Sequence, residues 1–103
     1  MKRRASVAQR KYSDCKSAND LREKLSSEGF SIFSWQDGPG AYYSPHSHSH
    51  DEYIVVHSGE IVFRIDGQDM LVTAGDALDL PAETVHAAEN KSEKPVAYFI
   101  CTK

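Results

Sequence analysis

The chain has few of the features that mark membrane proteins or disulfide-bonded scaffolds. No apolar run approaches the ~18 residues that span a bilayer, so we expect no membrane partner. Only two of the 103 residues are cysteine, Cys15 and Cys101, and they form no C-x-x-C pair. Two distant cysteines do not make a disulfide framework. No apolar stretch follows the basic residues near the start, as it would in a secretory signal. We therefore expect a reduced, cytoplasmic protein.

Acidic residues are absent from the first eleven positions and abundant afterwards. Residues 1–11 contain five of the twelve Lys and Arg residues and none of the fifteen Asp and Glu residues. The remainder carries seven basic and fifteen acidic side chains, a formal charge of −8. An acidic body argues against a nucleic-acid-binding surface. We interpret residues 1–11 as a basic, flexible N-terminal arm, with an interaction tail as the alternative, and residues 12–103 as one domain.

Turn signals and periodicity predict one short helix followed by many short strands. Residues 17–28 are expected to be helical, because Ser17 or Asn19 can cap the first turn and Gly29 suits the position after the last. Asp66-Gly67 is the strongest hairpin signal and favours a type I′ turn. The expected strands cover residues 30–35, 52–57, 61–65, 70–73, 77–80, 85–88 and 96–101. Short strands at regular spacing predict an antiparallel barrel or jelly roll.

Residue types that bind metal ions recur at fixed spacing in two segments. His46 and His48 are two residues apart, so they project from the same face of an extended strand. Glu52 would lie about 20 Å from His46 along a straight strand, so the chain must bend before it. His86 comes from a distant segment, which requires a closed or sandwiched sheet. Three imidazoles and one carboxylate form a ligand set for one divalent ion.

Strand parity separates the other candidates. Glu52 has the parity of Ile54 and Val56, which must face the core, so its carboxylate needs a partner that a metal ion would supply. An outward charge on an edge strand is the alternative for Glu52. His50 sits where the chain bends, and we favour an exposed loop histidine. Its alternative is to replace a neighbouring ligand or to support one. His57 has the opposite parity to Glu52 and is expected to be structural.

The two segments together resemble the two sequence motifs of the cupin family. The first motif is G-x5-H-x-H-x3/4-E-x6-G and the second is G-x5-P-x-G-x2-H-x3-N. Glu83 stands where the second motif usually has glycine. The matched positions are Gly40, His46, His48, Glu52, Gly59, Gly75, Pro81, His86 and Asn90. The resemblance implies a small single-domain cupin of the conserved-barrel type, with an all-β, antiparallel double-stranded β-helix as its fold.

The resemblance also implies a metal centre. His46, His48, Glu52 and His86 would bind one divalent transition metal ion, and these ligand types do not choose among Fe, Mn, Ni, Co, Cu and Zn. No catalytic residue stands out beyond the ligands; Tyr42, Tyr43 and Glu83 are weak candidates for a general base, and Asn90 is expected to close a turn. The aromatic residues that can wall a pocket or fill the core are Phe33, Trp35, Tyr42, Tyr43, Phe63 and Phe99.

Three classes of function remain open, because a fold does not decide function. The first is a metal-dependent enzyme acting on a small molecule, such as a dioxygenase or an isomerase, which the resemblance allows. The second is a small-ligand binding or sensing module without turnover. The third is a storage or structural domain, which the intact ligand set disfavours. We also expect a homodimer, because Tyr53, Val55 and Val62 offer an outward apolar surface.

Overall fold

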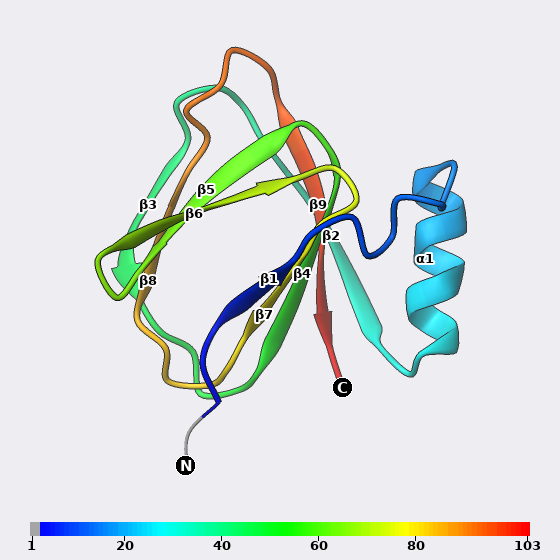
Figure 1. The fold of residues 1–103 in the computed structure, drawn as a ribbon, viewed down its shortest axis with the longest axis horizontal. Coiled ribbons are helices and arrows are strands. Elements are labelled where there is room, and N and C mark those ends of the chain that lie inside the picture. The colour runs from blue at the N-terminus through cyan, green and yellow to red at the C-terminus, as the bar shows by residue number, and fades with distance from the viewer. Residues whose placement is uncertain (1–2) are drawn as a thin grey trace.

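Two antiparallel sheets pack face to face in the computed structural model, which describes residues 3–103 (Figure 1). One sheet has the strand order β1-β7-β4-β9-β2 and the other has the order β3-β8-β5-β6. This is the expected all-β, antiparallel double-stranded β-helix with one short helix. The elements are β1 (Ser6–Ala8), α1 (Ala18–Ser27), β2 (Ser31–Asp37), β3 (Tyr42–His46), β4 (Glu52–Ser58), β5 (Glu60–Ile65), β6 (Gln68–Thr73), β7 (Ala77–Leu80), β8 (His86–Glu89) and β9 (Val96–Thr102).

The main core lies between the two sheets. Ile54 and Val56 face inward from β4, as their parity predicts, and both are buried. Phe63 meets them from β5 in the opposite sheet. Burial of apolar surface is the dominant favourable term in folding, so the contact between these two inner faces fixes the sandwich. The other fully buried members of this cluster include Ile61, Ile65, Val72, Leu78, Leu80 and Val96.

The helix covers the outer face of the five-stranded sheet (Figure 1). Ser17 caps it by accepting a hydrogen bond from the Asp20 N–H at 3.0 Å, which confirms the expected start. Leu21 and Leu25 pack against Val55, which is 0% exposed. The expectation that Val55 contributes to an outward apolar surface is therefore wrong, because parity identifies two faces but not which of them the chain itself covers. A homodimer stays a prediction.

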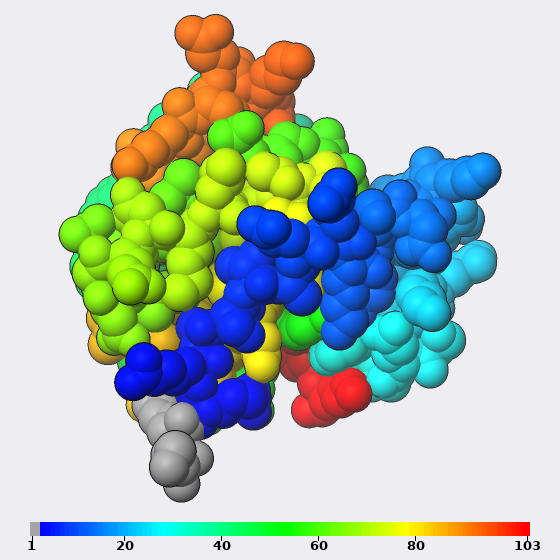
Figure 2. Space-filling view, in the orientation of Figure 1, coloured from blue at the N-terminus to red at the C-terminus, as the bar shows by residue number. Residues whose placement is uncertain are grey.

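The N-terminal segment is ordered where the sequence predicts a flexible arm. Residues 1 and 2, and with them Lys2 of that arm, lie outside the described residues. Ser6–Ala8 pairs with β7, which gives that edge of the sheet a partner. Arg3 binds the Asp79 carboxylate with two hydrogen bonds of 2.9 and 3.0 Å. Figure 2 shows this segment lying across one face of the molecule. The segment is ordered and not flexible because its basic Arg3 binds an acidic residue of the domain and its backbone pairs with β7.

Neither cysteine forms a disulfide, and burial raises the pKa of both thiols. Cys15 and Cys101 are both free thiols. Burial raises the pKa of the Cys101 thiol to about 12, which keeps it protonated at neutral pH. Within residues 3–103, no helix combines the length and the apolar character needed to cross a membrane.

Two glycines in left-handed turns provide a matched test of packing. Gly59 and Gly67 have φ of +78° and +76°. A Cβ at Gly59 would overlap the carbonyl oxygen of Pro95, whereas one at Gly67 would meet nothing within 4 Å. We expect Gly67→Ala to lower the free energy of unfolding by about 1–2 kcal/mol, because alanine is strained in the left-handed region. Gly59→Ala should lower it considerably more, because the overlap with Pro95 adds to that strain. Urea unfolding of both variants measures this, and equal losses would contradict the packing argument.

Asp76 provides a test that depends on pH. Burial by itself raises the pKa of its carboxyl, but hydrogen bonds from the Arg10 N–H, the Thr73 N–H and the Thr73 hydroxyl outweigh that effect and hold the pKa below its ordinary value. We expect Asp76→Asn to lower the free energy of unfolding by about 1–3 kcal/mol. The ionised carboxylate stabilises the folded state above its unfolded pKa of about 3.9, and this contribution disappears as pH falls through the lower folded value.

Chemical denaturation of the wild type and Asp76→Asn between neutral and acid pH measures the difference. The stability gap between the two proteins should be constant near neutrality and should narrow in acid. A gap that widens as the pH falls would show that the carboxylate does not act as an ionised hydrogen-bond acceptor.

Candidate metal centre

Three imidazole rings converge at one end of the sandwich. His46 ends β3, His86 begins β8, and the two residues are opposite each other where these strands pair. His48 lies two residues beyond the end of β3, in the following loop, and not in the strand that the sequence predicts for it. Its ring nevertheless lies 5.0 Å from that of His46 and 5.2 Å from that of His86, between centroids. The ligand atoms of the three histidines are all within 4.8 Å of one another.

Backbone carbonyls fix the orientation of two of these rings. The Nδ1 atom of His46 lies 2.6 Å from the Ser44 carbonyl oxygen, and that of His86 lies 2.9 Å from the Thr84 carbonyl oxygen. A ring nitrogen at this distance from a carbonyl oxygen carries the proton and donates it. The second nitrogen, Nε2, is then left as a lone-pair donor for a metal ion. Burial also lowers the pKa of His86, which favours its neutral form.

Glu52 reaches the site from the other sheet. The chain crosses between the sheets from His46 to Glu52, which is the bend that the spacing requires. The Glu52 Oε1 atom is 3.7 Å from His48 Nε2, and the Glu52 Oε2 atom is 3.4 Å from His50 Nε2. Glu52 is mostly buried, whereas the His50 side chain is 57% exposed. The carboxylate therefore borders the group of three histidines, between His48 and His50.

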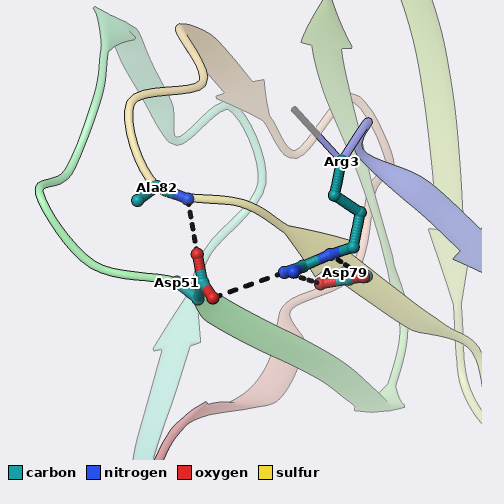
Figure 3. A network of polar contacts seen from close by, with 4 residues as sticks. All are labelled: Arg3, Asp51, Asp79 and Ala82. Atoms are coloured by element: carbon teal, nitrogen blue, oxygen red, sulfur yellow. Dashed lines mark hydrogen bonds and ion pairs between the residues drawn. The ribbon is translucent and has the colours of Figure 1, made fainter. Parts of the chain in front are cut away.

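Contacts between the two motif segments hold the loop that carries His48. The Glu83 N–H donates to the His48 carbonyl oxygen at 2.7 Å, and the Ala82 N–H donates to the Asp51 carboxylate at 2.8 Å. Arg3 lies 3.5 Å from the same carboxylate, so the N-terminal segment joins the network (Figure 3). Glu83 has φ of +65°, in the left-handed region that favours glycine. The backbone at Glu83 thus has the left-handed conformation that suits the glycine usual at this position of the second motif.

Two residues that the sequence assigned to structural roles have those roles. His57 packs against Phe99 with 4.6 Å between ring centroids, on the side of the sheet that the helix covers. Burial, together with Arg22, lowers the His57 pKa. Asn90 is fully buried and closes a turn, because its amide donates to the Lys94 carbonyl oxygen and its side-chain oxygen accepts from the Ser92 N–H.

A cavity of about 250 Å³ adjoins the three histidines. Four of the six aromatic residues named from the sequence line it, but Tyr42 does not, and Phe99 is buried in the cluster beneath the helix. Tyr98 also lines the cavity, although it is not among the residues expected there from the sequence. Its alternation with Ile100 along β9 was the available signal. The main apolar lining residues are Phe33, Trp35, Ile54, Phe63, Ala88 and Ile100.

The donor set fits a transition metal ion. Two nitrogens that bind one ion at about 2.1 Å can be at most about 4.2 Å apart, so the three histidines need only a small contraction to bind together. Neutral imidazoles suit the borderline-soft divalent ions of the first transition row. The cluster is therefore compatible with a metal ion, and the ligand types leave its identity open.

Comparison with known proteins agrees with this arrangement. A family profile described as "Cupin domain" matches residues 33–102. A Klebsiella pneumoniae protein with a double-stranded β-helix domain has 26% identity over 68% of this chain and 63% of its own, with a TM-score of 0.61. A structure of the DMSP lyases RdDddP and RnDddQII has 25% identity over 70% of this chain and 37% of its own, with a TM-score of 0.63.

A third structure, of Bacillus subtilis oxalate decarboxylase with Mn(II) centres, shares the fold at 24% identity, with a TM-score of 0.62, over 72% of this chain and 21% of its own. The chain thus spans less than two thirds of each of these three proteins. A search of curated proteins finds no match. Since the family profile covers more than half of the chain and the fold agrees, the chain belongs to the cupin domain family.

Proposed function

We propose that this chain binds one divalent transition metal ion and uses it to bind or convert a small molecule in the adjoining cavity. His46, His48 and His86 are the ligands that the geometry supports most directly, and Glu52 is the fourth. The observation that carries the proposal is the convergence of three imidazoles at a 250 Å³ cavity. Glu52 supports it because 3.7 Å from His48 Nε2 is within the span of two donors on one ion.

The protein residues have separate tasks in this proposal. The carbonyl oxygens of Ser44 and Thr84 hold the Nδ1 protons of two ligands and aim their free nitrogens at one point. Glu52 contributes a negative charge that offsets part of the charge of the ion. Phe63 and Ile54 keep the inner side of the cavity apolar. When bound, a divalent ion supplies a Lewis-acid centre that can bind and polarise an oxygen of the small molecule.

Turnover as a dioxygenase or an isomerase is the first form of this function. Binding or sensing without turnover is the second, and one observation favours it. Tyr43 and Tyr98 line the cavity, and the hydroxyls of both donate to Asp37. The hydrogen bond to this carboxylate, with burial, raises the pKa of Tyr43, and burial, with its own hydrogen bond to Asp37, raises the pKa of Tyr98. Neither tyrosine is therefore poised to act as a base at neutral pH.

Metal content per chain tests the ligand assignment. After chelation and reloading with Zn²⁺ or Mn²⁺, we expect wild type to hold one ion per chain. We expect His48→Ala and His86→Ala to lower occupancy at limiting metal by at least about tenfold. His57→Ala is the matched control, because it removes an imidazole from outside the group of three, and it should match wild type. Equal binding by all four proteins, or none by wild type, would reject the metal centre.

The fourth ligand needs its own comparison. We expect Glu52→Gln to weaken metal binding about ten- to a hundredfold, because it replaces an anionic donor by a neutral one. His50→Ala should leave the affinity within about threefold of wild type, because an exposed loop side chain adds little to a site that already has its donors. Competition titration with a coloured chelator gives both affinities. If His50→Ala weakened metal binding more than Glu52→Gln does, His50 and not Glu52 would be the fourth ligand.

Turnover is then tested on the metal-loaded protein. Oxygen uptake with diphenols, diketones and thiols examines the dioxygenase form, and chiral or NMR assays of the recovered compounds examine isomerisation. A compound that binds without being consumed or isomerised would favour the binding form. Binding that disappears in His86→Ala would tie either activity to the metal.

A further inference from the structure

We propose that the cavity selects a flat, apolar, ring-bearing molecule that presents a single oxygen donor to the metal, and that it discriminates against small dianions. The inference rests on the proposed function for the metal ion, and it adds the chemical class of the ligand. Four features of the cavity support it: the composition of its wall, the state of its tyrosines, the exposed aromatic pair at its mouth, and its balance of charge.

The wall of the cavity is almost entirely apolar and has no cationic side chain among the described residues. Apart from its two tyrosines and Trp35, its polar members are the three histidines and Glu52, which all belong to the candidate metal centre. Beyond them the wall is formed by aliphatic groups and aromatic rings. A second anionic group of a ligand would face Ile54, Ile100 and Phe63 and would lose its hydration without gaining a partner. The body of the ligand is therefore expected to be apolar.

The tyrosines of the cavity do not offer free donors to a ligand. Tyr43 donates its hydroxyl proton to Asp37 Oδ1 and Tyr98 donates its proton to Asp37 Oδ2, each at 2.6 Å. Trp35 Nε1–H is shared between Asp37 Oδ1 at 3.1 Å and the Tyr43 hydroxyl oxygen at 3.0 Å. One buried carboxylate thus takes the protons of both phenols and part of the indole donor. What remains toward the cavity is the faces and edges of the rings.

Two large aromatic side chains are exposed where the cavity opens. Phe33 and Trp35 are 55% and 43% exposed, and their rings stack with 5.7 Å between centroids. Both lie on β2, an edge strand, and both line the cavity, whereas Ile32, which precedes Phe33 and has the opposite parity, packs against the cluster beneath the helix. Aromatic rings gain stabilisation by offset stacking beyond their area burial. A flat ring of the ligand would cover these two side chains.

Size and charge narrow the class further. An apolar protein cavity of about 150 Å³ holds benzene, so this cavity of about 250 Å³ has room for a larger ring system. A divalent ion bound by the negatively charged Glu52 and three neutral imidazoles would give the metal centre one net positive charge. One anionic oxygen, such as a monocarboxylate or a phenolate, neutralises it. A dianion such as malonate would leave its second charge against the apolar wall.

Two probes compare these classes directly on the zinc-loaded protein. 2-Naphthoate has one anionic donor on an apolar ring system, and malonate has two anionic donors on a single carbon. We expect naphthoate to bind at least about tenfold more tightly by calorimetry, because it alone buries ring surface. It should also quench the fluorescence of Trp35, the only tryptophan. Malonate affinity equal to or above that of naphthoate would overturn the inference.

A charge introduced at the mouth tests the role of the wall. We expect Phe33→Lys to weaken naphthoate at least about fivefold and to strengthen malonate, because it removes a ring and adds a cation. Leu71→Lys is the matched control, since Leu71 is 48% exposed on β6 and does not line the cavity. It should leave both affinities unchanged. Naphthoate binding that is unaffected by Phe33→Lys would show that the ligand lies elsewhere.

Failure of this inference is distinguishable from failure of the proposed function. The metal content per chain tests the proposed metal centre. Ligand binding to the metal-free protein tests the aromatic wall of the cavity by itself. Neutral 2-naphthol should quench Trp35 in the metal-free protein, with an affinity that Phe33→Lys lowers and Leu71→Lys does not. If metal binds but neither naphthalene probe quenches Trp35, the ligand class is wrong and the metal centre stands. If naphthol binds but metal does not, the aromatic pocket stands and the metal centre is wrong.

Discussion

The structure depends on the burial of two apolar sheet faces against each other. Ile54 and Val56 on β4 and Phe63 on β5 belong to that contact, and β8 lies beside β5 in the same sheet. The metal-binding residue types continue the same inward positions to the end of the sandwich. Glu52 precedes Ile54 by two residues, and His86 precedes Ala88 by two. The candidate centre is therefore the polar end of the core, and the alternation of the strands that buries the apolar side chains also aims the ligands.

A single buried carboxylate organises the other side of the cavity. Asp37 ends β2 and accepts hydrogen bonds from three side chains on β2, β3 and β9, so it ties the two sheets together beside the opening. Within residues 3–103 no buried side-chain nitrogen or oxygen lacks a hydrogen-bond partner. Fully satisfied polar networks hold their members in one arrangement. The metal end and the aromatic wall are thus separate rigid parts, so a substitution in one should leave the other in place.

The sequence predicted the parts of this structure that depend on local chemistry. The capped helix, the hairpin at Asp66-Gly67 with both residues at positive φ, and the inward parity of β4 all follow from short-range signals. The pairing of β1 does not follow from such signals, because a strand of three residues is too short to show a periodic pattern. The covering of Val55 by α1 and the place of Tyr98 in the cavity depend on how distant elements pack. The loop position of His48 likewise reflects where β3 ends, and its ring still meets its partners through long-range contacts.

The pairing of the N-terminal segment also orders the steps of folding. Arg3 and Asp79 are 76 residues apart in the sequence, so this contact closes one of the longest loops in the chain. Long loop closures carry a large entropic cost and are favoured only after other contacts exist. During synthesis, β1 emerges before β7 and lacks this partner until β7 has emerged. The contact of Arg3 with Asp51, next to the loop that carries His48, therefore forms late, after the strands of the barrel have assembled.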